Sequence, residues 1–264
     1  MEYEDLLFEK KYGIATLTLN VPEKLNALSD KMRRSLALAV DEIAKDDEVR
    51  VVLVTGAGRG FCSGADVTQQ LDRSAGKLPE VSRYARIQVG GDLALHFPKL
   101  DKPVIAAING ACVGGGFSMA LACDIRIASE TAKFGTLFIA RGLVPDNGLT
   151  YSLPNIVGMS KALELMFTGE LFNAAEALRL GIVIRVVPPD QLMPEARGLA
   201  AKIAEQPPVA LELTKRLAYR FKMEEVVRQI YLEYWAQRIC WQTEDHKEAV
   251  RSFFEKRTPQ FKGK

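Results

Sequence analysis

The sequence has 264 residues, of which 48% are hydrophobic and 26% charged, as in an ordinary soluble globular protein. Its net charge of +2 gives no reason to propose nucleic acid as a partner, and no apolar run approaches the length needed to span a membrane. The two histidines and four cysteines show no CxxC spacing, so we expect reduced thiols and no His/Cys metal cluster. The first residues are acidic and lack an apolar stretch, so we expect no signal peptide and a cytoplasmic location.

Short strand-like runs recur along the chain, and helix-like segments separate some of them. Repeated strand–turn–helix units predict an α/β fold in which most strands are buried. The lengths of the repeats are irregular, which argues against a solenoid with a fixed period. Ser29 is the predicted N-cap of the first helix. The predicted strands are residues 14–19, 49–55, 103–108, 124–128 and 182–187, and the predicted helices include residues 29–45 and 161–168.

Two further segments differ from this pattern. Residues 69–91 are polar and mixed, and we expect a mobile loop plus helix that borders a site. Residues 194–254 show only helical patterns, with Val226, Ile230, Tyr234 and Ile239 recurring at roughly helical spacing. The sequence therefore predicts a core over residues 1–193 and a helical region over residues 194–264, which docks on the core or on another subunit.

The segment AAINGACVGGG at residues 106–116 is the most informative part of the chain. It follows a strand-like run and leads into an apolar helix-like segment. Consecutive glycines let a backbone come close to a ligand, and free amide N–H groups at a helix start attract negative charge. This arrangement suits half of an oxyanion hole.

A second glycine-rich segment, GAGRGFCSGAD at residues 56–66, directly follows a predicted strand. It does not fit GxxxxGK[ST], and no GxGxxG runs cleanly into a helix, so a phosphate-binding loop is not expected. Combined with the downstream glycine run and with PEKLNAL at residues 22–28, it resembles the crotonase superfamily of enoyl-CoA hydratases and isomerases. The resemblance extends from Leu17 to the C-terminus and includes CDIRIAS, AKFG, NAAEALRLGIV and FFEKRTPQFK.

The resemblance implies a crotonase-like spiral of ββα repeats with a C-terminal helical region that builds trimers, often paired into hexamers. It implies an acyl-CoA thioester as ligand, so coenzyme A enters as part of the substrate and no separate cofactor is expected. By matching motif positions, Ala65 and Gly115 would supply the two oxyanion-hole amides; the alternative is that these are turn and small core residues. Two fixed N–H donors stabilise an enolate oxygen more in the transition state than in the ground state. The neighbouring residues expected to line the substrate are Ser63, Gly64, Asp66, Gly114 and Phe138.

The same resemblance implies contacts with coenzyme A. Lys24 and the backbone around Leu25 and Ala27 match the family's nucleotide-binding loop, although Lys24 also fits a solvated surface lysine. Phe261 and Lys262 match tail residues that reach the ligand of a neighbouring subunit. The alternative for this tail is a frayed basic terminus.

Two positions depart from the pattern of family hydratases. The glutamate expected two residues after the glycine run is replaced by Ser118, and the second, three residues after the FG of AKFG, is replaced by Phe138. Hydration needs one group to activate water and another to protonate the α carbon. An ordinary hydratase mechanism is therefore not expected.

Asp146 lies eight residues past Phe138. This position matches a catalytic aspartate of dienoyl-CoA isomerases, of the ring-opening isomerases of phenylacetate degradation, and of halobenzoyl-CoA dehalogenases. An aspartate in an apolar surround, here suggested by Phe138, Ile139 and Leu143, has a raised pKa and can move a proton between two carbons. The alternative is that Asp146 caps a helix that starts at residue 147.

The sequence thus favours an enoyl-CoA isomerase and leaves three alternatives open. In a dehalogenase-like enzyme, Asp146 attacks the ring and His96 activates water, whereas His96 is otherwise a helix-end or interface histidine. An atypical hydratase recruits a loop carboxylate such as Glu80. A non-catalytic acyl-CoA-binding trimer belongs to a different class, and it binds the thioester without turnover.

Overall fold

The computed structural model describes residues 3–66, 68 and 92–264, and their strands form two sheets. The larger sheet has six strands in the order β1-β2-β3-β5-β7-β10, and the smaller has four in the order β4-β6-β8-β9. The loop and helix expected at residues 69–91, and Glu80 with them, lie outside the described residues.

The larger sheet begins with an antiparallel hairpin, β1 and β2, and continues with parallel strands. All five predicted strands are confirmed, although their ends shift by up to three residues, most in the last strand. The strands of this sheet are β1 (Leu6–Lys11), β2 (Ile14–Leu19), β3 (Val51–Gly56), β5 (Val104–Ile108), β7 (Ile125–Ser129) and β10 (Arg185–Val187).

The smaller sheet takes its strands from the same repeats. After each of β3, β5 and β7, the chain turns out of the larger sheet and forms β4, β6 and β8 in turn. These three strands pair in parallel. After β6 the chain enters helix α5 (Gly115–Leu121), so this repeat reads strand, strand, helix. The predicted crotonase-like ββα spiral is confirmed. The strands of the smaller sheet are β4 (Gly60–Cys62), β6 (Ala111–Val113), β8 (Lys133–Gly135) and β9 (Phe172–Asn173).

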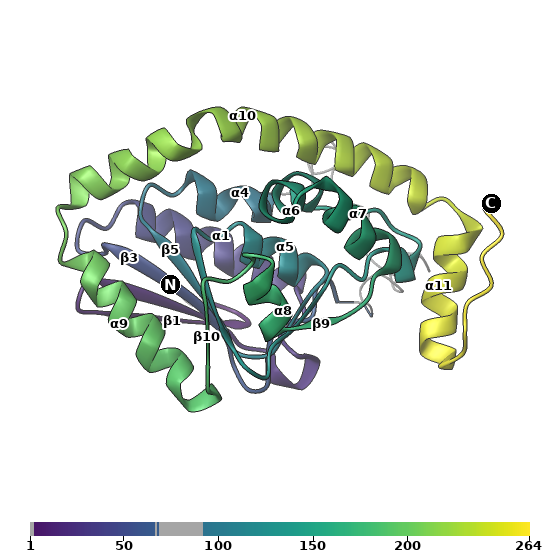
Figure 1. Cartoon of the computed structure of the whole chain (residues 1–264), viewed down its shortest axis with the longest axis horizontal. Coiled ribbons are helices and arrows are strands. Elements are labelled where there is room, and N and C mark those ends of the chain that lie inside the picture. Colours follow the sequence, from purple (N-terminus) through teal and green to yellow (C-terminus); the bar gives the residue numbers. More distant parts are fainter. Residues whose placement is uncertain (1–2, 67, 69–91) are drawn as a thin grey trace.

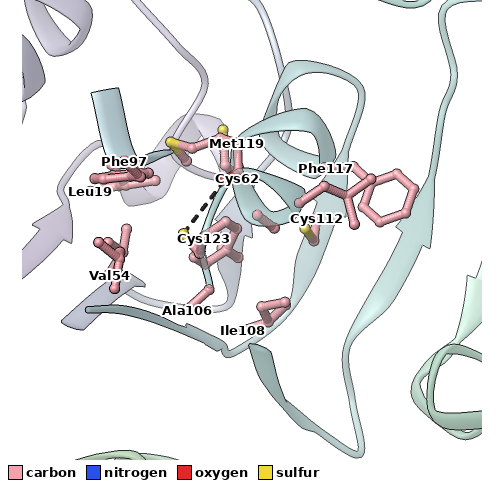
Figure 2. Close-up of a cluster of buried hydrophobic side chains, with 14 of the residues drawn as sticks. Leu19, Val54, Cys62, Phe97, Ala106, Ile108, Cys112, Phe117, Met119 and Cys123 are labelled. Carbon is pink, nitrogen blue, oxygen red and sulfur yellow. Dashed lines mark hydrogen bonds between the residues drawn. The ribbon is translucent and has the colours of Figure 1, made fainter. Parts of the chain in front are cut away.

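Both faces of the larger sheet are covered, which explains why its strands read as continuous apolar runs. In β3, Val52 and Val54 belong to the main core on one face, and Val51 and Leu53 belong to a second core on the other. Successive side chains of a strand point to opposite faces, so each core takes every second residue. Figure 2 shows part of the main core, where side chains of β3 and β5 meet those of α4 (Asp92–Lys99) and α5.

Two helices illustrate how local sequence fits this architecture. In α1 (Asp30–Ala44), Ser29 is the N-cap as predicted, and its Oγ accepts a hydrogen bond of 3.0 Å from the amide of Met32. The apolar face of α9 (Leu192–Ala204) includes Ala196 and Ala200, which pack on the second core. The boundary predicted between residues 193 and 194 falls inside α9, and the division into two regions stays a prediction.

The last 57 residues carry the longest helix, α10 (Pro208–Cys240), and then α11 (Glu244–Glu255). Figure 1 shows α10 running along one side of the whole molecule, with α11 and the C-terminus at its far end. No described helix is long and apolar enough to cross a membrane. The remaining helical segments are α6 (Leu149–Val157), α7 (Met159–Thr168), α8 (Ala174–Arg179) and the 3₁₀ turns η1 (Pro22–Lys24), η2 (Ile139–Arg141) and η3 (Pro189–Gln191).

The helix predicted from the apolar spacing is confirmed, and its inward face begins with apolar residues. Val226 and Ile230 are buried, whereas Ile239 is 49% exposed in this chain. The buried positions continue instead with two polar residues, Glu233 and Gln237, at the same helical spacing. These polar side chains face the cavity described next.

Candidate active site

The loops that follow β4 and β6 meet the C-terminal half of α10 around a cavity of about 390 Å³. We call it the central cavity. It contains Ala65, Gly115 and Asp146, three residues that the sequence predicted to act together from positions far apart in the chain. The described lining residues are Asp30, Arg33, Ser63, Gly64, Ala65, Gly114, Gly115, Leu137, Phe138, Arg141, Leu143, Asp146, Asn147, Ile230, Glu233, Tyr234, Gln237 and Trp241.

The two glycine-rich loops touch through their backbones at the edge of this cavity. Gly64 has φ +86°, and a Cβ there would lie 3.0 Å from the carbonyl oxygen of Val113 and 3.2 Å from the amide nitrogen of Gly115. A side chain would therefore be strained by its backbone conformation and would crowd the neighbouring loop. This close approach brings the segment around Ala65 beside Gly115.

The amide N–H groups of Ala65 and Gly115 have no acceptor among the residues that the structure describes. Gly115 is the first residue of α5, so its amide has no partner within the helix. The parallel bridge between Leu28 and Ala65 uses the amides of Leu28 and Asp66, and no described residue accepts from the amide of Ala65. Two such amides at adjoining loops match the donor arrangement expected of an oxyanion hole.

The predicted nucleotide-binding loop packs beside the first of these glycine-rich loops. The amide of Leu28 donates to the carbonyl of Gly64 at 2.7 Å, and the amide of Ser63 donates to that of Leu25 at 3.0 Å. The ammonium of Lys24 forms an ion pair of 2.8 Å with Asp66 while its side chain stays 49% exposed. Ala27 is buried in the same loop.

Asp146 projects from the segment between η2 and α6. The side-chain Nδ2 of Asn147 donates to its Oδ1, and Nε2 of Gln237 donates to its Oδ2 at 3.1 Å. Burial raises the pKa of Asp146 above its ordinary value, although the charge of Arg33 and the two amide donors oppose this rise. Phe138 and Leu143 line the cavity as expected, but Ile139 is 42% exposed and lies outside it, so its predicted part in the apolar surround is wrong.

Asp146 does not cap α6 through its side chain. The N-cap position of α6 is Gly148, and the carboxylate at its N-terminus is that of Glu233 on α10. Glu233 accepts 2.7 Å and 2.9 Å hydrogen bonds from the amides of Gly148 and Thr150, and a further one from the Thr150 hydroxyl. The capping alternative for the Asp146 side chain is therefore wrong, which leaves its carboxylate to face the cavity.

The two positions that lack the hydratase glutamates have clear structural roles. The hydroxyl of Ser118 donates to the backbone carbonyl of Asp146 at 2.9 Å, so it helps to hold the Asp146 segment against α5. Phe138 is buried and forms part of the cavity wall. The carboxylates among the described lining residues are those of Asp30, Asp146 and Glu233.

Three residues that the sequence singled out lie elsewhere in the fold. His96 is half-buried on α4 and is not among the described residues that line the central cavity. Phe261 and Lys262 lie in the exposed C-terminal tail, where the amide of Lys262 donates to Asp245 at 2.6 Å. Within this chain, neither tail residue reaches the central cavity.

The sequence did not single out Arg33, Glu233 or Gln237, which all line the cavity. Arg33 lies on α1, one turn after the predicted N-cap, and no motif marks it. Glu233 and Gln237 follow Val226 and Ile230 at intervals of three or four residues, which places all four on one face of a helix. Their position on the same helical face as Val226 and Ile230 is the signal that could have identified them, but hydrophobic periodicity alone passes over polar positions.

Comparisons with known proteins agree with this geometry. A family model described as enoyl-CoA hydratase/isomerase matches residues 9–264. The 1,2-epoxyphenylacetyl-CoA isomerase of Escherichia coli is 37% identical over 99% of both chains, and the short-chain-enoyl-CoA hydratase of Clostridium acetobutylicum is 38% identical over 97% of both. A crystal structure of an enoyl-CoA hydratase/isomerase from Pseudoalteromonas atlantica, 32% identical, superposes with a TM-score of 0.89 and covers 98% of this chain and 100% of that one. These matches confirm the resemblance that the glycine-rich motifs predicted.

Proposed function

The chain belongs to the enoyl-CoA hydratase/isomerase family, and from this premise we propose that it is an enoyl-CoA isomerase with Asp146 as its proton shuttle. One observation carries the proposal. Asp146, Ala65 and Gly115 line the same cavity, and the amides of Ala65 and Gly115 have no acceptor among the described residues. The two hydratase glutamate positions are Ser118 and Phe138. The site thus combines a pair of donors that can stabilise an enolate with Asp146 as the proposed base.

The proposed reaction moves a double bond along the acyl chain of a coenzyme A thioester. The thioester carbonyl oxygen accepts hydrogen bonds from Ala65 and Gly115, which lowers the energy of the dienolate that forms when a proton leaves carbon. Asp146 takes that proton from one carbon, and the protonated acid then returns it two carbons away on the same face. The net change is a shift of the double bond, with no gain or loss of atoms.

The environment of Asp146 suits this role. Because burial raises its pKa, the carboxylate is a stronger base than an exposed aspartate, and its protonated form is a usable acid. Its two oxygens each accept one amide donor, from Asn147 and Gln237, so the carboxylate is oriented before substrate binds.

The proposed binding of coenzyme A follows the family resemblance. Lys24, Leu25 and Ala27 would contact the nucleotide from their loop beside Gly64, and Lys24 would exchange its partner Asp66 for a phosphate or share both. Phe261 and Lys262 would contact the ligand of a neighbouring subunit in a homotrimer or hexamer. Coenzyme A is part of the substrate in this proposal, and the chemistry needs no further cofactor.

Hydration of the double bond is the second candidate, because one of the relatives cited above carries a hydratase name and Glu233 places a second carboxyl in the cavity. Glu233 already accepts three hydrogen bonds at the start of α6, against two for Asp146, so it has less remaining capacity to accept a proton from water. Isomerisation needs only Asp146 and is therefore favoured. The dehalogenase-like alternative requires a histidine at the site, and His96 is not among the described lining residues.

A panel of enoyl-, dienoyl- and aryl-CoA thioesters, followed by mass spectrometry, tests the proposal. The wild-type protein should convert an enoyl-CoA to an isomer of equal mass. The Asp146→Asn variant should lose about 10²–10⁴-fold in kcat while it still binds the thioester, since it keeps the cavity shape and loses only the base.

Three results of this screen would contradict the isomerase. Unchanged turnover by Asp146→Asn would remove the proposed base, and a product heavier by one water would indicate a hydratase. Tight binding of the thioesters with no turnover on any of them would indicate a non-catalytic acyl-CoA-binding protein.

A further inference from the structure

We propose that Glu233 and Gln237, one turn apart on α10, are positioning residues that hold Asp146 in its reactive orientation. The inference rests on the proposed function, in which Asp146 is the base. In this proposal neither residue transfers a proton to or from the substrate. Both act on the segment that carries Asp146, and both come from a helix that lies about ninety residues further along the chain.

Gln237 fixes the carboxylate itself. Its Nε2 donates to Oδ2 of Asp146 at 3.1 Å, and its Oε1 accepts from the amide of Val144 at 3.2 Å. Both ends of the side-chain amide are therefore engaged, which fixes its rotation and aims the donor at the carboxylate. Gln237 is only 3% exposed, so its side chain is largely shielded from bulk water.

Glu233 fixes the turn that follows Asp146. It accepts from the amides of Gly148 and Thr150, two and four residues beyond the aspartate. The two residues that directly follow Asp146 have left-handed backbones, with φ 56° at Asn147 and 76° at Gly148. A left-handed asparagine costs energy and persists only where its surroundings impose it, and the Glu233 carboxylate contributes that constraint from outside the segment.

The helix that carries both residues is itself well anchored at this point. Val226 and Ile230 are buried on the same face and pack against Leu95 and Tyr151, which belong to α4 and α6. A positioning residue needs a rigid base, and this contact provides one within two turns of Glu233.

The charges around the pair make its action measurable. Asp146 faces Arg33 of α1, and Glu233 and Gln237 of α10, while Asp30 and Arg141 line the same cavity. Burial, together with the negative charge of Asp146, raises the pKa of Glu233 to about 7. The hydrogen bonds from the Gly148 amide and from the amide and hydroxyl of Thr150 oppose this rise. Protonation of Glu233 below that pH removes part of its capacity to accept these donors, so the turn that holds Asp146 loosens.

The test compares the pH dependence of kcat in Glu233→Gln and Gln237→Met with a matched control, Glu225→Gln. Glu225 lies on the same helix and accepts a 2.7 Å hydrogen bond from Tyr151 of α6, but it is exposed and outside the cavity. Each cavity variant should lower kcat by about 10- to 100-fold, the cost of a misplaced catalytic group, with KM unchanged. The control should match the wild type.

The direction of the pH shift separates positioning from simple loss of fold. In Glu233→Gln the acid limb of the pH–kcat profile should move to lower pH, because the carboxyl group that titrates near 7 is gone. In Gln237→Met it should move to higher pH, because the carboxylate loses a donor that lowers its pKa. A variant that was only less stable would keep the limb in place.

The proposal would be overturned if Gln237→Met, like the control Glu225→Gln, had the kcat of the wild type and the same acid limb in its pH–kcat profile. If Glu233→Gln fails to fold, Gln237→Met decides alone, since it removes no charge and keeps the side-chain length. An active Asp146→Asn would instead refute the proposed function. An inactive Asp146→Asn with a normal Gln237→Met would refute only the positioning role.

Discussion

Asp146 carries an energetic cost that follows from its burial. Its pKa in the folded chain lies above the ordinary value, so the folded state binds a proton at this group more tightly than the unfolded chain does. The contribution of Asp146 to stability is therefore greatest below its unfolded pKa and declines as the pH rises through its folded pKa. At neutral pH the ionised carboxylate destabilises the fold while it supplies the base.

We therefore expect Asp146→Asn to be more stable than the wild type at pH 7 even though it is inactive. A gain of about 1 kcal/mol would raise the Tm by roughly 2–4 °C in a chain of this size.

The contrasting variant is Asp66→Asn. Burial raises the pKa of Asp66, but hydrogen bonds from Lys24 and Thr68 outweigh this and hold it below its ordinary value, so the substitution should lower the Tm. Thermal unfolding at pH 7 measures both, and a lower Tm for Asp146→Asn would contradict the account.

At the scale of elements, α10 brings polar side chains to the site, and its first half is held by a buried ion pair. Lys215 forms a 2.8 Å ion pair with Asp124 and donates to the carbonyl oxygens of Phe97 and Lys102 at 2.8 Å and 2.9 Å. The side chains of Lys215 and Asp124 are 6% and 16% exposed. Removing one partner of such a pair leaves an uncompensated buried charge, which is costly.

Lys215→Met should therefore lower the free energy of unfolding by about 3–5 kcal/mol. Arg216→Met is the matched control, because the neighbouring Arg216 pairs with Asp101 on the surface with its side chain 64% exposed, and such pairs contribute about 0–1 kcal/mol. Adding Asp124→Asn to Lys215→Met should recover part of the loss, since the unpaired charge is gone. Urea unfolding of the four proteins measures these differences. Equal losses in the two single variants would show that α10 is not held by this pair.

The elements of the core followed from the sequence more fully than the site did. Buried parallel strands and the Ser29 cap leave local patterns in the sequence. Through the family resemblance of their motifs, Ala65, Gly115 and Asp146 could be placed in one site. Glu233 and Gln237 could not, because their role depends on where a distant helix packs. The capping of α6 shows the same limit, since sequence proximity favoured Asp146 and the fold supplied Glu233 instead.

At the scale of the whole molecule, the outer face of α10 carries a stripe of exposed apolar side chains. Leu217, Phe221 and Trp235 are 67%, 80% and 65% exposed, and Figure 1 shows α10 at the margin of the molecule. Several large exposed apolar side chains on one helix face are costly in water and typical of an interface. It supports the proposal that the C-terminal helices associate copies of the chain into a homotrimer or hexamer.

We expect sedimentation to show an oligomer of three or six chains, and Phe221→Glu or Trp235→Glu to shift it toward smaller species. Burying such a side chain contributes about 1.5–3 kcal/mol, so each variant should weaken association by about 10- to 100-fold. Tyr12→Glu is the control, because Tyr12 is 85% exposed in the β1–β2 turn, far from α10 in sequence. A wild-type protein that sediments as a monomer at all concentrations would contradict this assembly.

The most direct measurement of the central claim follows an enoyl-CoA through the enzyme in heavy water by mass spectrometry. If Asp146 shuttles one proton between two carbons, the product is an isomer that carries at most one deuterium per turnover and retains some substrate-derived protium. Asp146→Asn should form neither the isomer nor a deuterium-exchanged substrate. A product that has gained one molecule of heavy water, or exchange that continues in Asp146→Asn, would contradict the assignment of Asp146 as the shuttle.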